Sequence, residues 1–155
     1  LLSRSALADR SAGSVQDVIG AAEMDKSTVK RIVFSSGKVY YDLFEARQKA
    51  GRDDVALVRL EQLYPFPRID YEAIITAYPN AKDVVWCQEE PENQGAWYQI
   101  KHRLRAYLAA AHQLFYVTRK GSATTAVGYL KVHNKEPEEL CEAALNGGLP
   151  LQGGA

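Results

Sequence analysis

The densest group of chemically active side chains lies in the segment 87–97, which reads CQEEPENQGAW. Glu89 and Glu90 are adjacent carboxylates, and two nearby carboxylates can serve as an acid and a base when their surroundings separate their pKa values. Adjacent residues of an extended segment point to opposite sides, so these two need not converge on one substrate. We therefore expect a structural or interface role for this segment rather than catalysis.

The same segment carries residue types that suit a protein interface. Tryptophan is enriched at binding hot spots, and polar side chains around it make directional hydrogen bonds to a partner. The predicted interface residues are Glu89, Glu90, Asn93, Gln94 and Trp97. Asn93 also has the side chain of a helix cap for the helix that follows, and a glycine at position 95 allows a close approach of the backbone.

A fragment of a phosphate-binding loop follows the first predicted strand at Ser36, Gly37 and Lys38. A complete loop of this kind needs another glycine five residues earlier and a hydroxyl after the lysine, because several amides must surround the phosphate. A tight turn between a strand and a helix accounts for Gly37, although the helix N-terminus can still attract an anion. One alternative function therefore stays open, a free-standing nucleotide-binding module that uses Ser36 to Lys38.

The remaining reactive residue types show no catalytic spacing. His102, His112 and His133 are not arranged as metal ligands, and no Gly-x-Ser-x-Gly motif supplies a nucleophile. Cys87 and Cys141 are far apart and form neither a disulfide framework nor a zinc motif, so we expect buried free thiols. The sequence predicts no catalytic residue and no metal ligand in this chain.

Short apolar runs alternate with amphipathic segments and define the elements that position these residues. The predicted strands are 31–35, 55–60, 84–88, 114–118 and a short edge strand at 127–133. The predicted helices are 39–50, about 70–77, a long stripe from 97 to 111, and 137–145, where Pro137 takes the first helical position. This order predicts an α/β domain of three layers with a mostly parallel sheet of about five strands.

Composition places these elements in one domain without a global charge. The 155 residues are 46% hydrophobic, and 19 basic residues balance 19 acidic ones, so we expect no nucleic-acid or membrane partner. We interpret 1–28 as a linker arm, 29–146 as the domain and 147–155 as a tail. Without an apolar run of membrane-spanning length or a signal sequence, the chain is expected to be soluble and intracellular.

Three segments together resemble the C-terminal end of the first component of bacterial 2-oxoglutarate dehydrogenase. They are SGKVYYD at 36–42, LEQLYPFP at 60–67 and WCQEEPENQGAW at 86–97, and the last is the most specific. The resemblance covers about residues 30 to 145. It implies the fold of the C-terminal domain of transketolases and a module that completes the subunit and helps to form a dimer.

The resemblance also implies the chemistry of a larger enzyme of the tricarboxylic acid cycle. Members of that family decarboxylate 2-oxoglutarate on thiamine diphosphate and magnesium, and they pass the succinyl group to lipoamide on a second component. The implied partners are the preceding domains, a homodimer mate and the lipoyl-bearing second component. This chain lacks the Gly-Asp-Gly motif with its later asparagine that holds magnesium in the thiamine fold. We therefore expect it to hold no cofactor and to be inactive alone.

The resemblance further implies an effector site. Some family members respond to acetyl-CoA or adenine nucleotides, and Gln62 matches a position of the motif associated with that effector. Arg68 stands where relatives carry a basic cluster, but Ile69 and Asp70 follow it here, so the cluster is reduced. A 2-oxoadipate or other 2-oxoacid dehydrogenase remains the close alternative.

Overall fold

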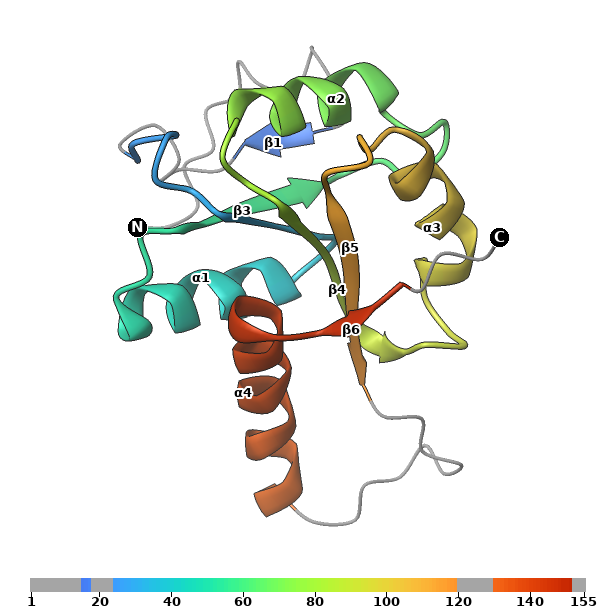
Figure 1. The fold of residues 1–155 in the computed structure, drawn as a ribbon. Coiled ribbons are helices and arrows are strands. Elements are labelled where there is room, and N and C mark those ends of the chain that lie inside the picture. The colour runs from blue at the N-terminus through green and yellow to red at the C-terminus, as the bar shows by residue number, and fades with distance from the viewer. Residues whose placement is uncertain (1–14, 18–23, 120–129, 152–155) are drawn as a thin grey trace.

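A parallel sheet forms the centre of the computed structural model, which describes residues 15–17, 24–119 and 130–151 (Figure 1). The elements are β1 (Val15–Asp17), β2 (Arg31–Ser35), α1 (Val39–Ala50), β3 (Val55–Leu60), α2 (Arg68–Ala77), β4 (Asp83–Pro91), α3 (Trp97–Ala106), β5 (Gln113–Arg119), α4 (Leu130–Asn146) and β6 (Leu149–Pro150). The predicted α/β class and mostly parallel sheet are confirmed.

The strand order within the described residues is β1-β3-β2-β4-β5-β6. The four inner strands are parallel, whereas β1 and β6 pair antiparallel at the two edges. The chain leaves β2 toward β3 on one side and then crosses back over β2 to form β4. The strand order therefore reverses between β2 and β4, and in open parallel sheets ligands bind at such a point, beyond the carboxyl ends of the strands.

Two apolar layers cover the two faces of the sheet, because successive strand residues point to opposite sides. In β2, Ile32 and Phe34 belong to the cluster under α2 and α3, whereas Val33 belongs to the cluster under α1 and α4. Figure 1 shows the same division, with α2 and α3 on one side of the sheet and α1 and α4 on the other. Strands buried on both faces explain the continuous apolar runs in the sequence.

The C-terminal helix differs from the prediction. The described part of the predicted edge strand, 130–133, is the first turn of α4, and 127–129 lies outside the described residues. Pro137 lies inside α4 rather than at its start. A proline costs a helix the N–H bond to the carbonyl four residues earlier, and burial of Cys141, Ala144 and Leu145 against the sheet offsets that loss.

The structure also adds detail in three other segments. The stripe from 97 to 111 is helical only to Ala106, although Tyr107 and Leu108 continue to pack against the core, which explains the apolar period. Three residues of the predicted linker arm form β1, which pairs with β3. In the predicted tail, Leu149 and Pro150 form β6 beside β5. Both edge strands have too few residues for an alternation of apolar and polar side chains to be recognised in the sequence.

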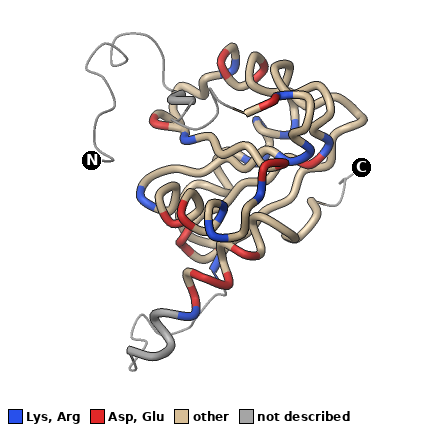
Figure 2. Tube along the Cα trace, turned by 90° about the vertical axis from the view of Figure 1, so that its left-hand side faces the viewer, with Lys and Arg blue, Asp and Glu red and all other residues tan. Residues whose placement is uncertain are grey.

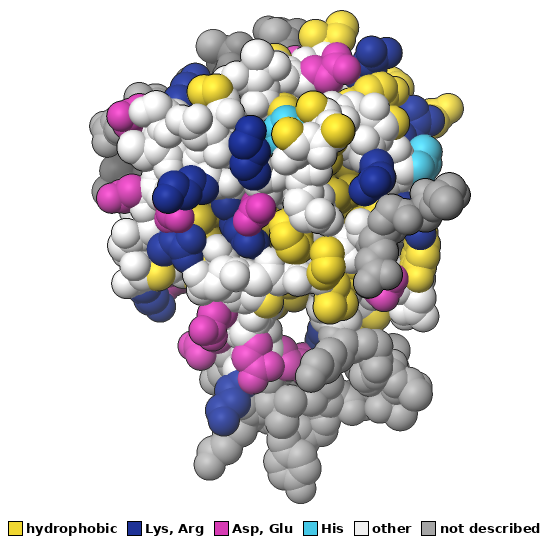
Figure 3. Space-filling view, in the orientation of Figure 1, with side chains coloured by type: hydrophobic (Ala, Val, Ile, Leu, Met, Phe, Trp, Pro, Cys, Tyr) yellow, Lys and Arg dark blue, Asp and Glu magenta, His cyan; other side chains and the backbone are white. Residues whose placement is uncertain are grey.

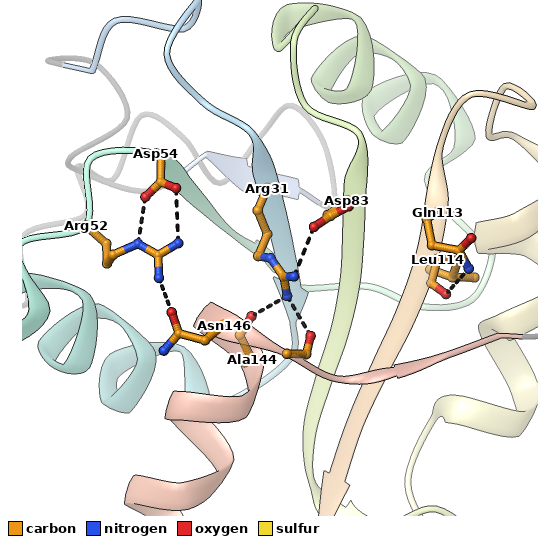
Figure 4. A network of polar contacts seen from close by, with 9 residues as sticks. Arg31, Arg52, Asp54, Asp83, Gln113, Leu114, Ala144 and Asn146 are labelled. Carbon is orange, nitrogen blue, oxygen red and sulfur yellow. Dashed lines mark hydrogen bonds and ion pairs between the residues drawn. The ribbon is translucent and has the colours of Figure 1, made fainter.

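A buried arginine joins the end of α4 to the sheet. Arg31 is 9% exposed, and its guanidinium donates to the carbonyl oxygens of Ala144 at 3.2 Å and Gly147 at 2.7 Å (Figure 4). It also pairs with the Asp83 carboxylate at 3.0 Å and lies over the Phe115 ring. The last carbonyl groups of a helix have no hydrogen-bond donor within the helix. Arg31 provides donors for two carbonyl groups at this end of α4.

Candidate functional site

The three segments that carry the family resemblance gather at one edge of the sheet. They follow β2, β3 and β4, which are parallel, and Ser35 at the end of β2 pairs in register with Arg59 and Cys87. The carboxyl ends of these strands therefore lie side by side. This carboxyl edge also contains the point where the strand order reverses, so it is the candidate functional site.

An ion pair crosses the reversal point. Lys38, which follows β2, lies 3.5 Å from the Glu89 carboxylate at the end of β4. The Lys38 side chain is 79% exposed and that of Glu89 36%, and an exposed pair of this kind contributes at most about 1 kcal/mol. Within this structure the lysine of the phosphate-loop fragment therefore faces a carboxylate rather than an empty anion site.

A cleft of about 390 Å³ opens beside this ion pair, between the carboxyl edge and α4. It is lined by Lys38, Val39, Asp42, Glu89, Arg119, Glu136, Pro137, Leu140 and Cys141. Arg119 pairs with Glu136 at 2.8 Å, so both cations of the cleft are neutralised by carboxylates. Figure 2 marks the positions of acidic residues along α4 on the Cα trace.

The two cysteines lie beneath this cleft as unreactive thiols. Burial raises the pKa of the Cys87 thiol far above its ordinary value, and burial also raises that of Cys141 to about 11. Both side chains are at most 2% exposed. Nucleophilic cysteines have a lowered pKa and some exposure, so the chemistry of these thiols fits packing rather than catalysis.

A buried glutamine organises the loop that follows β4. Gln88 is 3% exposed, and its Oε1 accepts the indole N–H of Trp86 and the backbone N–H of Trp97, each at 3.0 Å. Its Nε2 lies within hydrogen-bond distance of the carbonyl oxygens of residues 90, 91 and 94, at 3.2, 3.0 and 2.8 Å. Two donors face the oxygen and three acceptors face the nitrogen, which fixes the orientation of the amide.

The glycine at position 95 is required by this arrangement. Gly95 has a φ of +69°, and an added Cβ would lie 3.1 Å from the Gln88 Nε2 and 3.1 Å from the Glu90 Cβ. Any L side chain there would combine an unfavourable backbone conformation with a crowded contact. The predicted close backbone approach at this position is confirmed.

Trp97 occupies the core rather than the surface. It is 1% exposed, and its ring stacks on that of Tyr116 with centroids 4.6 Å apart. Helix α3 begins at Trp97 with Ala96 as its cap residue and no side-chain cap bond, so the predicted capping role of Asn93 is wrong. Gln88 performs that role from β4, because it accepts the first N–H of the helix. The indole supports the loop from inside and offers no area to a partner.

The other predicted interface residues are on the outside of the loop. Glu90, Asn93 and Gln94 are exposed, and Glu89, which pairs with Lys38, is half-buried. Glu89 and Glu90 make different contacts, since Glu90 lies beside Gly95. The two carboxylates therefore have different neighbours in the structure.

The predicted effector residues lie at the ends of the segment between β3 and α2. Gln62 is exposed, and its side-chain N–H donates to the carbonyl oxygen of Tyr64 at 3.0 Å. Arg68, at the first position of α2, pairs with Glu72 at 3.3 Å and lies over the Tyr107 ring at 4.6 Å. Its side chain is 60% exposed, so the guanidinium can still reach an anion in solution.

The described residues offer no metal site and no membrane span. No group of three or more His, Cys, Asp and Glu side chains within 24–119 and 135–151 could hold a metal ion. None of the helices in the described part of the chain is both long and apolar enough to cross a bilayer. Figure 3 shows basic, acidic and hydrophobic side chains interspersed on one face.

Sequence reasoning did not identify Gln88 as the organising residue. It ends an apolar run and stands between two tryptophans at positions 86 and 97, and each of these carries an indole N–H that needs an acceptor when buried. A polar amide at the end of a predicted apolar strand was the available signal. Its five partners, most of them backbone groups, are not visible in a sequence.

Comparison with known proteins gives the family. Residues 4–145 match the family model described as 2-oxoglutarate dehydrogenase C-terminal. The 2-oxoglutarate dehydrogenase E1 component of Haemophilus influenzae is 48% identical over 135 residues, which are 86% of this chain and 14% of that protein. Those of Azotobacter vinelandii and Cupriavidus necator are 46% and 45% identical, and each match covers 90% of this chain and 15% of the relative. The chain spans about one seventh of the length of these relatives.

A solved structure supports the fold. A chain described as split gene transketolase, inactive beta4 tetramer, aligns with a TM-score of 0.53 over 75% of this chain and 39% of that chain. Its sequence identity is 13%, so it supports the predicted transketolase C-terminal-like fold and nothing about activity. The resemblance inferred from the three segments is confirmed by the family match, and this chain belongs to the 2-oxoglutarate dehydrogenase C-terminal family.

Proposed function

We propose that this chain is a non-catalytic domain of a 2-oxoglutarate dehydrogenase first component, which completes the subunit and contacts the other subunit of a dimer. The observation that carries the proposal is the loop after β4. Its backbone is fixed by a buried amide, while Glu90, Asn93 and Gln94 project to solvent. A rigid polar loop without a nucleophile or metal cluster suits recognition of a protein surface.

The chemistry of the whole enzyme is assigned to its other parts. We propose that those parts bind thiamine diphosphate and magnesium, decarboxylate 2-oxoglutarate and transfer the succinyl group to the lipoyl-bearing second component. The names of the relatives support this assignment. The lack of a Gly-Asp-Gly motif with its later asparagine in this sequence supports placing the cofactor in those parts. A cytoplasmic location is proposed because the named relatives are bacterial.

The proposal is tested by the activity of the isolated chain. Mixed with thiamine diphosphate, magnesium and 2-oxoglutarate, it is expected to release no carbon dioxide above the buffer blank, whereas the full-length enzyme does. Turnover that survives repurification and disappears in the Glu89→Gln variant would assign catalysis to the carboxyl edge instead. Calorimetric titration with thiamine diphosphate and magnesium is expected to give no binding heat for the isolated chain.

A second role at a separate place is favoured by the geometry of Arg68. We propose that Gln62 and Arg68 contribute to a site for acetyl-CoA or an adenine nucleotide in the full enzyme. Stacking on Tyr107 holds the guanidinium near one position, while more than half of the side chain remains exposed. Arginine binds phosphate through two parallel hydrogen bonds, and prior ordering lowers the entropic cost of that contact.

A further inference from the structure

We infer that Gln88 is the positioning residue of the dimer contact: it holds the loop 89–96 in its binding shape before the second subunit arrives. The inference rests on the proposed function, because it concerns the same loop. It adds a specific residue and a mechanism, the prior ordering of the contact surface. Gln88 itself is buried and touches no partner directly.

The first step of the argument is the position of the amide inside the loop. The chain runs out along β4, turns through 91–95 and returns at Trp97 to start α3. Gln88 bonds to the outgoing part at residues 90 and 91, to the turn at residue 94 and to the returning part at residue 97. One side chain therefore ties both arms of the loop to each other.

The second step is that the other contacts of this loop each hold a single residue of it: Lys38 pairs with Glu89, Pro91 pairs with Arg119 in the sheet, and the Tyr98 hydroxyl donates to Glu92. Within the loop, the backbone N–H of Gln94 donates a hydrogen bond to the Pro91 carbonyl oxygen at 2.9 Å. The β4 and β5 pairing is irregular between Cys87 and Pro91, so the sheet ladder does not hold the segment continuously. Without the Gln88 amide, the carbonyl groups that it satisfies would turn to water, and the loop would sample several shapes.

The third step is that only an uncharged amide fits this position. A leucine of similar size would leave the two donors and the carbonyl oxygens of residues 90 and 94 without this partner, and the Pro91 carbonyl would keep only its bond from the Gln94 N–H. A glutamate could accept from Trp86 and Trp97, but its second carboxylate oxygen would face three carbonyl oxygens. Protonation would restore a donor, and burial next to carbonyl oxygens raises the pKa of such a carboxyl group, so the Gln88→Glu defect should be reversible by acid.

Prior order in the loop affects association, because a disordered loop must lose conformational entropy when it docks. The exposed side chains of Asn93 and Gln94 lie on the turn that Gln88 bonds directly. Loss of the amide is therefore expected to weaken dimerisation without removing any group that touches the partner.

The experiment compares four variants of the full-length enzyme: Gln88→Leu, Gln88→Glu, the double variant Asn93→Arg with Gln94→Arg, and Gln113→Leu as a control. Gln113 is exposed at the opposite end of the sheet and makes a single long bond of 3.4 Å to the Leu114 carbonyl. Mass photometry over a dilution series gives the dimer dissociation constant. Hydrogen exchange of the diluted monomer gives the protection of the Trp97 amide.

Three results are expected together. Gln88→Leu raises the dissociation constant at least tenfold and speeds exchange of the Trp97 amide at least tenfold, while strand amides of β2 and β3 keep their protection. At pH 7.5 the Gln88→Glu variant has the same dissociation constant and the same Trp97 exchange rate as Gln88→Leu. At pH 5.5 both quantities for Gln88→Glu move toward the wild-type values measured at that pH. Gln113→Leu behaves as wild type.

Failure of the positioning role and failure of the proposed dimer contact would give different results. If the double arginine variant weakens the dimer but Gln88→Leu frees the loop without changing the dissociation constant, the positioning role is wrong and the dimer contact stands. If neither changes the dissociation constant, the dimer contact is wrong. If Gln88→Leu does not fold, the wild-type monomer decides: a Trp97 amide that exchanges as fast as an exposed loop amide overturns the inference, and protection equal to that of β4 upholds it.

Discussion

The side-chain oxygen of Gln88 lies 3.0 Å from the backbone nitrogen of Trp97 and accepts its hydrogen bond. This contact joins the end of β4 to the start of α3 across the loop that separates them. It stands in for a cap residue, since Ala96 before the helix has no side-chain acceptor. The conformation of the loop therefore depends on one amide and on the small residue that packs against it.

That dependence predicts the cost of a side chain at position 95. Gly95 and Gly51 both have positive φ values, +69° and +63°, but an added Cβ meets nothing within 4 Å at Gly51. Alanine at either position pays the backbone cost of about 1–2 kcal/mol. Gly95→Ala should lose about 1–3 kcal/mol more, because the crowded Gln88 amide is already fixed by its bonds. Urea unfolding of the two variants measures the difference, and equal losses would show that the loop adjusts freely.

A second prediction concerns the arginine that binds the end of α4. Arg31→Leu leaves the carbonyls of Ala144 and Gly147 and the partly exposed Asp83 carboxylate without this partner, so the free energy of unfolding should fall by about 1.5–3 kcal/mol. Lys49→Leu is the control. The ion pair of Lys49 with Glu45 is exposed, so its loss is expected to lower the free energy of unfolding by less than about 0.5 kcal/mol. Similar losses in both variants would contradict a structural role for Arg31.

The buried thiols predict a loss of stability in alkali. The folded pKa of Cys141 is raised to about 11, while an unfolded thiol has a pKa of about 8.5. Above pH 8.5 the unfolded state therefore loses protons that the folded state keeps, and stability falls as the pH rises toward 11. Replacing Cys87 and Cys141 by alanine should flatten this part of the stability profile, measured by urea unfolding between pH 8 and 11. An unchanged slope would mean that other groups, such as buried Tyr71, account for it.

The proposed effector site predicts a separation between activation and basal turnover. In the full enzyme, Arg68→Ala should raise the activation constant for acetyl-CoA or an adenine nucleotide by about tenfold, because a charge-assisted contact to phosphate contributes about 1.5–3 kcal/mol. Basal turnover should change little. Glu72→Gln is the matched control, because it removes the ion pair with Arg68 and keeps the guanidinium over Tyr107. Equal activation constants in wild type and Arg68→Ala would remove Arg68 from the site.

Much of the fold is readable from the sequence where packing and local pattern agree. The ranges of β2, α1 and β3 match the predicted 31–35, 39–50 and 55–60, because strands buried on both faces are continuously apolar and Gly51 ends the helix in a left-handed conformation. The errors occur where tertiary contacts override the local signal. Pro137 marks a helix start by propensity, yet it lies within α4, whose buried face packs against the sheet.

The candidate site was predictable in place but not in detail. The polar composition of 88–97 after a predicted strand locates it at the carboxyl edge, and three similar segments identify the family. The assignment of Trp97 to the surface failed because a tryptophan at the start of a helix has the same sequence signal whether it faces a partner or the core. The side chain at 97 is committed to stacking on Tyr116, which only the folded chain brings within reach.

The measurement that tests the central claim most directly is the dimer dissociation constant of the full-length enzyme carrying Asn93→Arg and Gln94→Arg. The control is Gln48→Arg, which adds positive charge at an exposed position of α1. We expect the loop variant to raise the dissociation constant at least tenfold, with the turnover of the remaining dimer unchanged and the control equal to wild type. An unchanged dissociation constant together with a large fall in turnover would contradict the account and assign catalysis to the loop.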